Sequence, residues 1–355
     1  MKSLNQFKNI KDKRVLLRVD FNVPISKGKI LDDFRIKQAL PTISYLRKKG
    51  AKIILLSHLG RSGGSLKPIA EYLNKFFPVQ FGQGKPLPGK VILLENLRQN
   101  PGEEKNDLVF AKKLAKLGDV YINEAFSVSH RKQASISQLP KLLPSYFGFQ
   151  FEREIKNLSS VFKPKKPMLL ILGGAKFETK MPMLKKFIKI ADYIFVAGAL
   201  ANNFFKEIGF EVGRSVVDEK NFGLKKLLAS GKIFLPIDVV VKKGNKKLIK
   251  AQNEVGKDEK IVDIGPTSVK LLEHLIGKSK FVLWNGPLGW YEGGFGGSTE
   301  RILKFKKLQK NKTIIGGGDT VALVSKLKLD KKLTFVSTGG GAMLEFLSKG
   351  KLLNK

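Results

Sequence analysis

Hydrophobic residues recur in short runs along the whole chain, and amphipathic stretches separate these runs. In the first half, apolar runs of strand length occupy residues 14–22, 51–58, 90–96 and 119–126. Between them, residues 33–49 and 66–77 repeat apolar positions at helical spacing, and Gly50 follows as a stop signal. Alternation of buried strands with amphipathic helices predicts a parallel sheet covered by helices.

The same rhythm starts again after a break near the middle of the chain. Residues 151–162 predict a helix, and the following KPKKP forces an extended segment. A second series of predicted strands then covers residues 168–174, 192–198, 232–241, 280–286, 312–318 and 333–340. The expected fold is therefore α/β: two Rossmann-like three-layer lobes with mainly parallel sheets, joined by a helix and hinge. We place the domains at residues 1–155 and 156–345.

Composition agrees with two domains and excludes several classes of function. A chain of 355 residues is longer than one comfortable core. Cysteine is absent, which excludes thiolate catalysis, disulfides and thiolate-bound metal, and we expect a cytoplasmic protein. No apolar run approaches about 18 residues, so we expect no membrane partner.

The charge of the chain is strongly basic, with 66 Lys and Arg residues against 30 Asp and Glu residues and a net charge of +36. Such an excess can indicate nucleic-acid binding. The lysines, however, are dispersed over the whole chain and no RNA-binding aromatic motif or zinc-finger spacing accompanies them. We favour a solvated basic surface and do not expect a nucleic-acid partner, although a basic nucleic-acid-binding protein stays open as an alternative.

Four glycine-rich segments follow predicted strands of the second half: LGGAK (172–176), WNGPLG (284–289), IGGGDT (315–320) and STGGGA (337–342). A glycine-rich turn at a helix N-terminus suits an anion such as phosphate. Asp319 would repel a bare phosphate, so we expect a cation between them and predict phosphate with Mg²⁺. Lys176 and Lys180 are four residues apart, and both follow the Gly-Gly strand end.

The first half places cations and polar residues at its strand ends: Asp20, Asn22, Arg35, His58, Arg61, Arg98 and Arg131. Arginine offers a planar fork that matches phosphate and carboxylate oxygens. As a set, these residues predict a basic pocket for a small, multiply charged anion. No obvious base or nucleophile accompanies them, but phosphoryl transfer to a carboxylate needs none, because that acceptor is already ionised.

With these residues assembled, the chain closely resembles the phosphoglycerate kinase family. The matching motifs cover nearly the whole chain in order: RVDFNVP, DDFRIKQALPTI, SHLGR, LLENLR, INEAFSVSHR, LGGAK, LPIDVVV, DIGP, WNGPLGWYE, IGGGDT and STGGGAMLE. The resemblance implies a two-lobed, hinge-bending monomer. It transfers phosphate between ATP and 3-phosphoglycerate, with 1,3-bisphosphoglycerate and ADP as the other pair and Mg²⁺ bound with the nucleotide.

The resemblance also implies roles for individual residues. The acid would be held by Asp20, Asn22, Arg35, His58, Arg61, Arg98 and Arg131, and Arg35 would also meet the transferring phosphoryl group. The nucleotide would be held by Gly173, Gly174, Ala175, Lys176, Lys180, Asn285, Gly286, Pro287, Glu292, Gly316, Gly317, Gly318, Asp319 and Thr320. Asp319 would bind Mg²⁺, and the catalytic set would be Arg35, Lys180, Gly317 and Gly340.

Some positions of the chain differ from the family pattern. Glu124 stands in INEAF where Asp is expected, and we expect its longer reach to loosen that loop. The chain ends LSKGKLLNK, without the usual Leu-Pro-Gly close, and residues 346–355 are expected to form a tail that packs on the first lobe. A degenerate homologue that binds nucleotide without transferring phosphate stays open as a second alternative.

Overall fold

A computed structural model describes residues 1–60, 63–82, 89–220 and 222–350. The described chain divides into two compact units, Met1–Lys156 and Asn157–Gly350. Helix α6 (Phe149–Ser159) contains the boundary between them. Residues 346–350, which we assigned to a tail on the first lobe, end helix α14 (Gly341–Lys349) and belong to the second unit. The rest of that expected tail lies outside the described residues.

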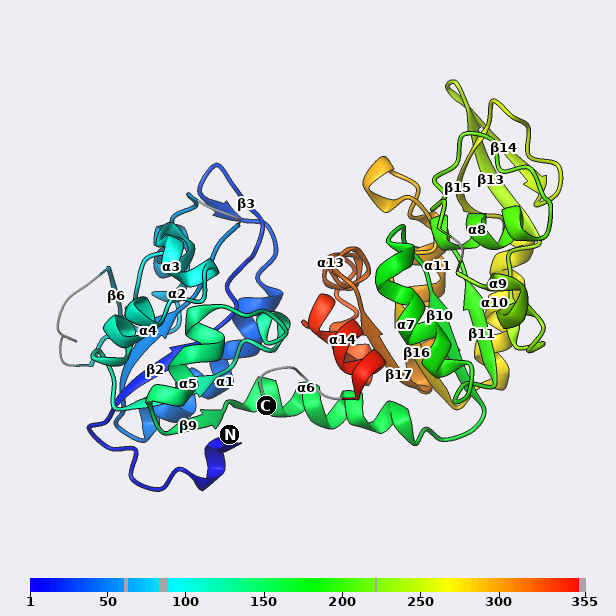
Figure 1. Ribbon diagram of the computed structural model, residues 1–355. Helices are drawn as coiled ribbons and strands as arrows, with labels where there is room; N and C mark the ends of the chain where they lie inside the picture. Colours follow the sequence, from blue (N-terminus) through cyan, green and yellow to red (C-terminus); the bar gives the residue numbers. More distant parts are fainter. Residues whose placement is uncertain (61–62, 83–88, 221, 351–355) are drawn as a thin grey trace. The chain divides into compact units, whose positions relative to one another are not determined.

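The first unit is built on a seven-stranded parallel sheet (Figure 1). Its order is β1 (Lys2–Ser3), β9 (Ser145–Phe147), β8 (Val120–Asn123), β2 (Arg14–Arg18), β5 (Lys52–Leu56), β7 (Val91–Leu93) and β6 (Val79–Phe81). The register of the central pair places Leu17 opposite Leu55. A short hairpin, β3 (Ile25–Ser26) with β4 (Lys29–Ile30), extends from the loop after β2.

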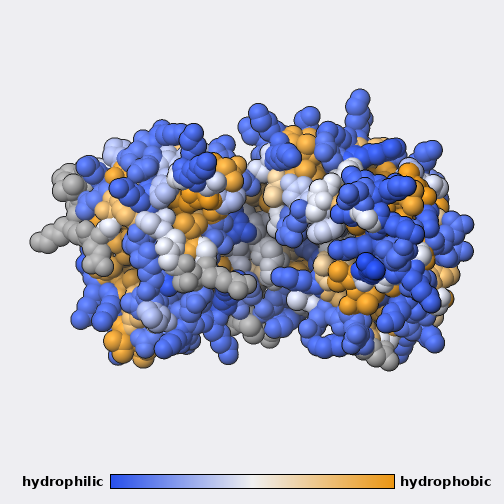
Figure 2. All heavy atoms as spheres, turned by 90° about the horizontal axis from the view of Figure 1, so that it is seen from above, coloured by the Kyte–Doolittle hydropathy of each residue, from blue (hydrophilic) through white to orange (hydrophobic). Residues whose placement is uncertain are grey.

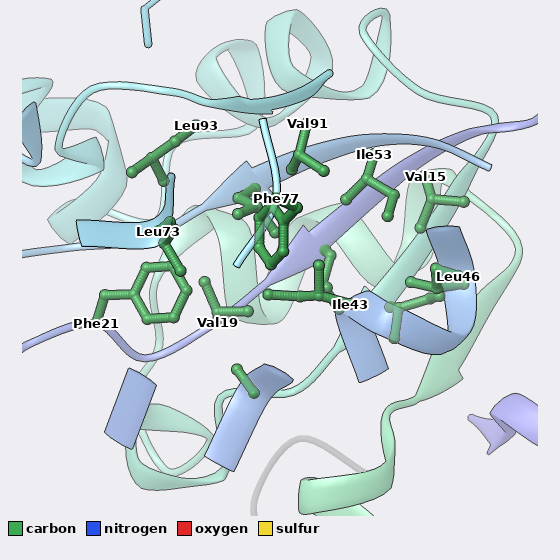
Figure 3. Packing of buried hydrophobic residues seen from close by; sticks show 14 of the residues in the cluster. Val15, Val19, Phe21, Ile43, Leu46, Ile53, Leu73, Phe77, Val91 and Leu93 are labelled. Carbon is green, nitrogen blue, oxygen red and sulfur yellow. The ribbon is translucent and has the colours of Figure 1, made fainter. Parts of the chain in front are cut away.

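Alternate residues of the central strand β2 explain why this sheet is covered on both faces. Val15 and Leu17 belong to one hydrophobic cluster, shown in Figure 3, which includes Ile43 of α1 (Phe34–Lys48) and Leu73 of α2 (Lys67–Leu73). Leu16 belongs to a second cluster with residues of α4 (Leu108–Ala115) and α5 (Leu139–Leu142). Because successive side chains of a strand point to opposite faces, these two clusters make three layers.

Short helical turns lie in the connections of the first unit, and one of them carries Arg98. They are η1 (Leu4–Gln6), η2 (Leu97–Gln99), η3 (Phe126–Val128) and the π-helical turn η4 (Ala134–Gln138). Helix α3 (Pro101–Glu104) follows η2 directly, and the Asn100 side chain caps it by accepting a hydrogen bond from the Gly102 amide.

The second unit contains a six-stranded parallel sheet in the order β12 (Ile233–Phe234), β11 (Tyr193–Val196), β10 (Met168–Leu172), β16 (Phe281–Asn285), β17 (Lys312–Gly316) and β18 (Phe335–Val336). Every residue of β10 and β16 is buried. Central strands buried on both faces are typical of a parallel sheet covered by helices. The longer helices of this unit are α7 (Phe177–Phe187), α8 (Ala199–Glu207), α10 (Pro266–Lys278), α11 (Gly297–Lys304), α13 (Gly318–Lys326) and α14.

One predicted strand of the second unit is divided in the structure. Residues 232–241 form β12 of the parallel sheet and then β13 (Asp238–Lys243) of a separate antiparallel sheet, with Pro236 between them. Proline cannot donate to a strand ladder, which explains the break. The separate sheet also contains β14 (Lys246–Ala251) and β15 (Lys260–Ile264), which sequence analysis did not identify as strands.

The remaining short elements of the second unit are α9 (Leu224–Leu228), α12 (Lys306–Lys310), η5 (Ser160–Phe162), η6 (Tyr291–Gly293) and η7 (Asp330–Lys332). Figure 2 shows hydrophilic side chains spread over the visible face of each unit, with small hydrophobic areas between them. Within the described residues, no helix is both long and apolar enough to cross a bilayer.

Candidate functional site

The candidate residues of the first unit lie just beyond the carboxyl ends of its parallel strands. Asp20 and Asn22 follow β2, His58 follows β5, Arg98 lies in η2 after β7, and Arg131 follows η3. Strands of a parallel sheet end at the same edge, which is where α/β proteins bind their ligands. Arg61, the seventh candidate, lies outside the described residues.

Asp20 is the centre of the contacts in this cluster. Its carboxylate accepts hydrogen bonds from Arg35 of α1 and from the Ser127 hydroxyl, and Oδ1 accepts the Asn22 amide at 3.1 Å. His58 Nε2 lies 4.0 Å from Oδ1. Burial raises the pKa of Asp20, but the Arg35 guanidinium and the hydrogen bonds outweigh burial and hold that pKa at about 2. Asp20 is therefore a permanent anion that fixes Arg35.

Asn22 and Arg98 meet at the backbone of Gly60. The Asn22 side-chain oxygen accepts the Gly60 amide at 2.9 Å, and Arg98 Nη1 donates to the Gly60 carbonyl. The Arg98 side chain is buried, with Nε 3.3 Å from Glu104 Oε1, and its Nη2 has no hydrogen-bond partner among the described residues. A buried guanidinium with a spare donor is suited to an anionic oxygen.

Cations crowd one another in this cluster, which is unfavourable without an anion between them. Burial lowers the pKa of Arg98, and the nearby charge of Arg131 lowers it further. Burial and the charge of Arg18 lower the pKa of His58 to about 3, partly opposed by Asp20. His58 is therefore neutral near pH 7. The structure thus brings six of the seven candidates into one electrostatically coupled, cationic group.

The candidate site of the second unit is made mainly of backbone. Strands β10, β11, β16 and β17 end beside one another, and a glycine lies within two residues after each end. The Gly173 amide donates to Asn285 O at 3.0 Å, and the Gly174 amide donates to Pro287 O at 2.8 Å. These bonds join the LGGAK and WNGPLG segments into one surface.

Glycine is required here because the neighbouring backbones approach too closely for a side chain. A Cβ on Gly173 would lie 2.0 Å from Pro287 O, and one on Gly286 would lie 2.4 Å from Gly173 O. Gly286 and Gly317 also have φ of +91° and +97°, a region that L-residues rarely adopt. A Cβ on Gly317 would lie 3.0 Å from the Gly286 nitrogen, which brings IGGGDT against WNGPLG.

Lys180 places a charge in the middle of these glycines. It is on α7, which starts after the exposed Ala175 and Lys176, and it is 8 % exposed. Its ammonium donates to the Gly173 carbonyl, and a Cβ on Gly174 or Gly286 would come within 2.7 Å of Nζ. Burial lowers the pKa of Lys180 to about 8, opposed by the Asp319 carboxylate. Lys180 and Asp319 are therefore electrostatically coupled.

The first turn of α13 adds the other polar groups. Gly318 and Asp319 are exposed there, while Thr320 is buried and its hydroxyl has no hydrogen-bond partner among the described residues. Gly316, which ends β17, is packed on Met343, whose Sδ would lie 2.0 Å from an added Cβ. Gly340 precedes α14 with φ of +46°, and no heavy atom lies within 4 Å of the position of an added Cβ. Glu292 is exposed on η6, and its approach to a nucleotide stays a prediction.

These groups fit a magnesium-bound nucleotide better than a metal held by protein alone. Among the residues that the structure describes, no cluster of three or more His, Asp or Glu side chains could hold a metal ion. Mg²⁺ is commonly bound by one or two carboxylates together with substrate phosphates. Asp319 supplies one carboxylate, Lys180 and the helix N-terminus suit phosphate, and the unpartnered Thr320 hydroxyl is a further polar contact.

Comparisons with known proteins agree over nearly the whole chain. The sequence model described as phosphoglycerate kinase matches residues 4–351. The chain belongs to the phosphoglycerate kinase family. The phosphoglycerate kinase of Fervidobacterium nodosum is 40 % identical, over 97 % of this chain and 95 % of the relative, and that of Borreliella afzelii is 39 % identical, over 99 % and 98 %.

Solved structures of phosphoglycerate kinases confirm the predicted α/β fold of two lobes. The structure from Coxiella burnetii has a TM-score of 0.82 at 34 % identity, covering 99 % of this chain and 97 % of that chain. The structure from Pyrococcus horikoshii has a TM-score of 0.83 at 29 % identity, with the same coverage. The family resemblance inferred from the sequence motifs is therefore confirmed.

The structure also adds residues that sequence analysis missed, in both phosphoglycerate kinase lobes. Arg18 is fully buried beside His58, Glu103 and Ser135 are fully buried beside Arg18, and Ser127 contacts Asp20. Gly198 of the second unit supports Gly174, because a Cβ on Gly198 would lie 2.6 Å from the Gly174 nitrogen. A charged residue inside the apolar strand RVLLRV was the available signal for Arg18. No comparable signal marked Glu103 or Ser135, which lie in polar segments.

The expectation that Glu124 loosens its loop is wrong. Its carboxylate is buried and accepts the Thr42 hydroxyl and the Gln150 amide at 3.1 Å, at the first turn of α6. A Cβ on Gly148 would lie 2.0 Å from Glu124 Oε2, so glycine makes room for the longer side chain. The longer reach therefore caps the helix that contains the unit boundary.

Proposed function

We propose that this chain catalyses reversible phosphoryl transfer between ATP and the carboxylate of 3-phosphoglycerate, which yields ADP and 1,3-bisphosphoglycerate. The observation that carries the proposal is membership of the phosphoglycerate kinase family over nearly the whole chain. The two strand-edge clusters support it, because one offers arginines for a small anion and the other offers glycines, Lys180 and Asp319 for a nucleotide. The family name places the reaction in glycolysis and gluconeogenesis.

In the first unit, we assign Asp20, Asn22, Arg35, His58, Arg98 and Arg131 to the acid, together with Arg61. Arg98 and Arg131 neutralise the charge of the substrate phosphate, and Asp20 holds Arg35 in one orientation. Arg35 then stabilises negative charge on the transferring phosphoryl group. No general base is required, because the acceptor carboxylate is ionised at pH 7.

In the second unit, we assign the phosphates to the backbone amides of residues 173–176 and 316–320 and to Lys180. Asn285, Gly286, Pro287 and Glu292 are assigned to the nucleoside side. The backbone at Gly317 and Gly340, at the N-termini of α13 and α14, stabilises the charge that develops on the transferred group. Mg²⁺ bound with the nucleotide neutralises phosphate charge, and Asp319 is the residue that would hold it.

We include three further properties in this proposal: hinge-bending that brings the two bound substrates together, a monomeric state and a cytoplasmic location. Such a motion lets substrates held by different lobes meet, and closure excludes water. The comparisons favour neither a degenerate homologue nor a nucleic-acid-binding protein.

The test is a coupled assay of ADP formation from ATP, 3-phosphoglycerate and Mg²⁺. Wild-type activity should require all three components. Arg35→Ala should lower kcat by roughly 10³-fold with nearly unchanged nucleotide affinity, because Arg35 acts on the transferring group. Lys37→Ala is the control: Lys37 is on the same helix, is exposed and pairs only with Asp33 among the contacts described. Near-normal turnover in Arg35→Ala would remove Arg35 from the mechanism, and a folded, inactive wild type would refute the proposed function.

A further inference from the structure

A chain of buried polar groups lies behind His58, on the side away from Asp20. Arg18 is 0 % exposed; its Nε donates to Ser135 Oγ at 2.8 Å, and its Nη1 donates to Val19 O at 2.5 Å. Its Nη2 lies 3.2 Å from His58 Nδ1. Arg18 therefore touches His58 directly, although it lies within β2 and was not among the candidate residues of the acid site.

Glu103 is the counter-charge of this buried arginine. Its carboxylate is also 0 % exposed, and Oε1 lies 3.9 Å from Arg18 Nη2. Ser135 joins the two residues: its hydroxyl donates to Glu103 Oε1 at 2.6 Å, and its amide donates to Oε2 at 2.9 Å. A fully buried guanidinium needs such a partner, because an unpaired buried charge is strongly unfavourable.

The contact between Arg18 and His58 determines which ring nitrogen carries the proton. A guanidinium has only donors, so His58 Nδ1 must be the acceptor and the ring proton must be on Nε2. A proton on Nδ1 would face an Arg18 N–H at 3.2 Å. The Nε2–H then points to the side of Asp20, a candidate acid ligand whose Oδ1 is 4.0 Å away.

We propose that Glu103, acting through Ser135 and Arg18, is a positioning residue that fixes His58 as a neutral Nε2–H donor to the anionic substrate. The inference rests on the proposed function of the acid site. It makes the donor independent of pH across the physiological range, whereas an unconstrained histidine changes charge near pH 6.5. The charged groups that the structure describes around the ring agree, since Arg18, Arg98 and Arg131 disfavour the imidazolium and Asp20 alone among them favours it.

The first measurement is nitrogen NMR of the full wild-type chain labelled with ¹⁵N-histidine. The chain has only three histidines, and His58→Gln identifies the signal by its loss. We expect one protonated nitrogen, Nε2, and one unprotonated nitrogen, Nδ1, without titration between about pH 5.5 and pH 8. A protonated Nδ1, or titration of His58 in that range, would overturn the proposal without any variant.

The second measurement uses Glu103→Gln, which removes the charge and keeps an acceptor for Ser135. Arg18 should then lose its fixed orientation, and His58 should populate both tautomers while staying neutral, because the surrounding arginines still disfavour the imidazolium. KM for 3-phosphoglycerate should rise about tenfold, with kcat within about twofold of wild type, because one hydrogen bond to a charged ligand is weakened. Glu103→Asp, which restores the charge, should return the wild-type tautomer. Glu71→Gln is the control, on the exposed face of α2.

Ser135→Ala is the second variant, should Glu103→Gln fail to fold, because it removes the hydroxyl that joins Glu103 to Arg18. Unchanged His58 signals in either variant contradict the inference. The NMR readout needs no turnover, so it separates two failures. An inactive wild type with the expected tautomer refutes the proposed function alone, and an active wild type with the opposite tautomer refutes this inference alone.

Discussion

The two candidate sites of this chain both lie at the carboxyl ends of parallel strands, but different chemical groups form them. In the first unit, the strand ends present buried, ionisable side chains, with Asp20, His58 and Arg98 all below 9 % exposure. In the second unit, the strand ends present glycine backbone, and Lys180 is the buried charge among them. A parallel sheet therefore supplies a place for a ligand, and the residues after each strand decide how the ligand is held.

This difference determines which changes each site tolerates. A site made of charged side chains depends on protonation states and hydrogen-bond geometry, and its cost is the burial of those charges. A site made of backbone depends on space, because phosphate must approach the amides closely. We therefore expect the first site to be sensitive to the loss of a single charge or hydrogen bond, and the second to be sensitive to a single added methyl group.

The largest effect should come from Gly286→Ala. The new Cβ would lie 2.4 Å from the Gly173 carbonyl oxygen and 2.6 Å from Lys180 Nζ, at a φ of +91°. Backbone cannot move aside cheaply, so the joined glycine segments must separate. Affinity for Mg-ADP should fall about a thousandfold, and affinity for 3-phosphoglycerate should stay near that of wild type. Isothermal titration calorimetry with each ligand measures both.

Gly209→Ala is the matched control for this substitution. Gly209 has a φ of +88°, but no heavy atom lies within 4 Å of its added Cβ. The control therefore carries the backbone strain, about 1–2 kcal/mol, without the clash. Equal losses of Mg-ADP affinity in the two variants would show that backbone strain, and not the close contact between glycine backbones, causes the loss. The second site would then not depend on space in the way that we propose.

Sequence predicted the glycine site more completely than the charged one, for a physical reason. Glycines after strands are visible as local motifs, and their contacts with one another follow from strand order. Arg18, Glu103 and Ser135 are brought together from separate segments, and only the tertiary structure shows that all three are fully buried. Similarly, β14 contains mostly lysine and exposed apolar residues, so its sequence lacks the pattern of a buried strand. Its antiparallel pairing with β13 determines its strand conformation instead.

A smaller effect, on stability, is expected at Glu124. Burial raises the pKa of this carboxyl to about 7, opposed by Thr42 and by the first amides of α6. Between its ordinary pKa and about 7, the folded state keeps a proton that the unfolded state releases, so the stability from this group falls as pH rises. Glu124→Gln removes the titration. From about pH 5 to pH 8, stability of the variant relative to wild type should therefore rise by roughly 2 kcal/mol.

Two readouts of denaturant unfolding separate the lobes in this experiment. Both tryptophans, Trp284 and Trp290, are in the second unit, so their fluorescence follows that unit. Pulsed hydrogen exchange of β2 and β5 peptides follows the first. The pH-dependent difference between wild type and Glu124→Gln should occur only in the exchange readout. The same difference in tryptophan fluorescence, or none in either readout, would contradict a pH-sensitive first lobe.

The smallest effect, and the sharpest probe of the comparison, is expected from Arg98→Lys. The substitution keeps the positive charge but removes the planar fork, one arm of which donates to the Gly60 carbonyl while Nη2 has no partner among the described residues. If geometry as well as charge holds the acid, KM for 3-phosphoglycerate should rise about tenfold while Mg-ADP affinity is unchanged. Arg14→Lys is the control, because Arg14 also forms a forked pair, with Asp119, but on the exposed surface. If Arg98→Lys binds the acid as well as Arg14→Lys does, charge alone holds the substrate. The first site would then bind the acid through its net positive charge, without a need for precise hydrogen-bond geometry. Of the two sites, the glycine site alone would depend on close steric fit.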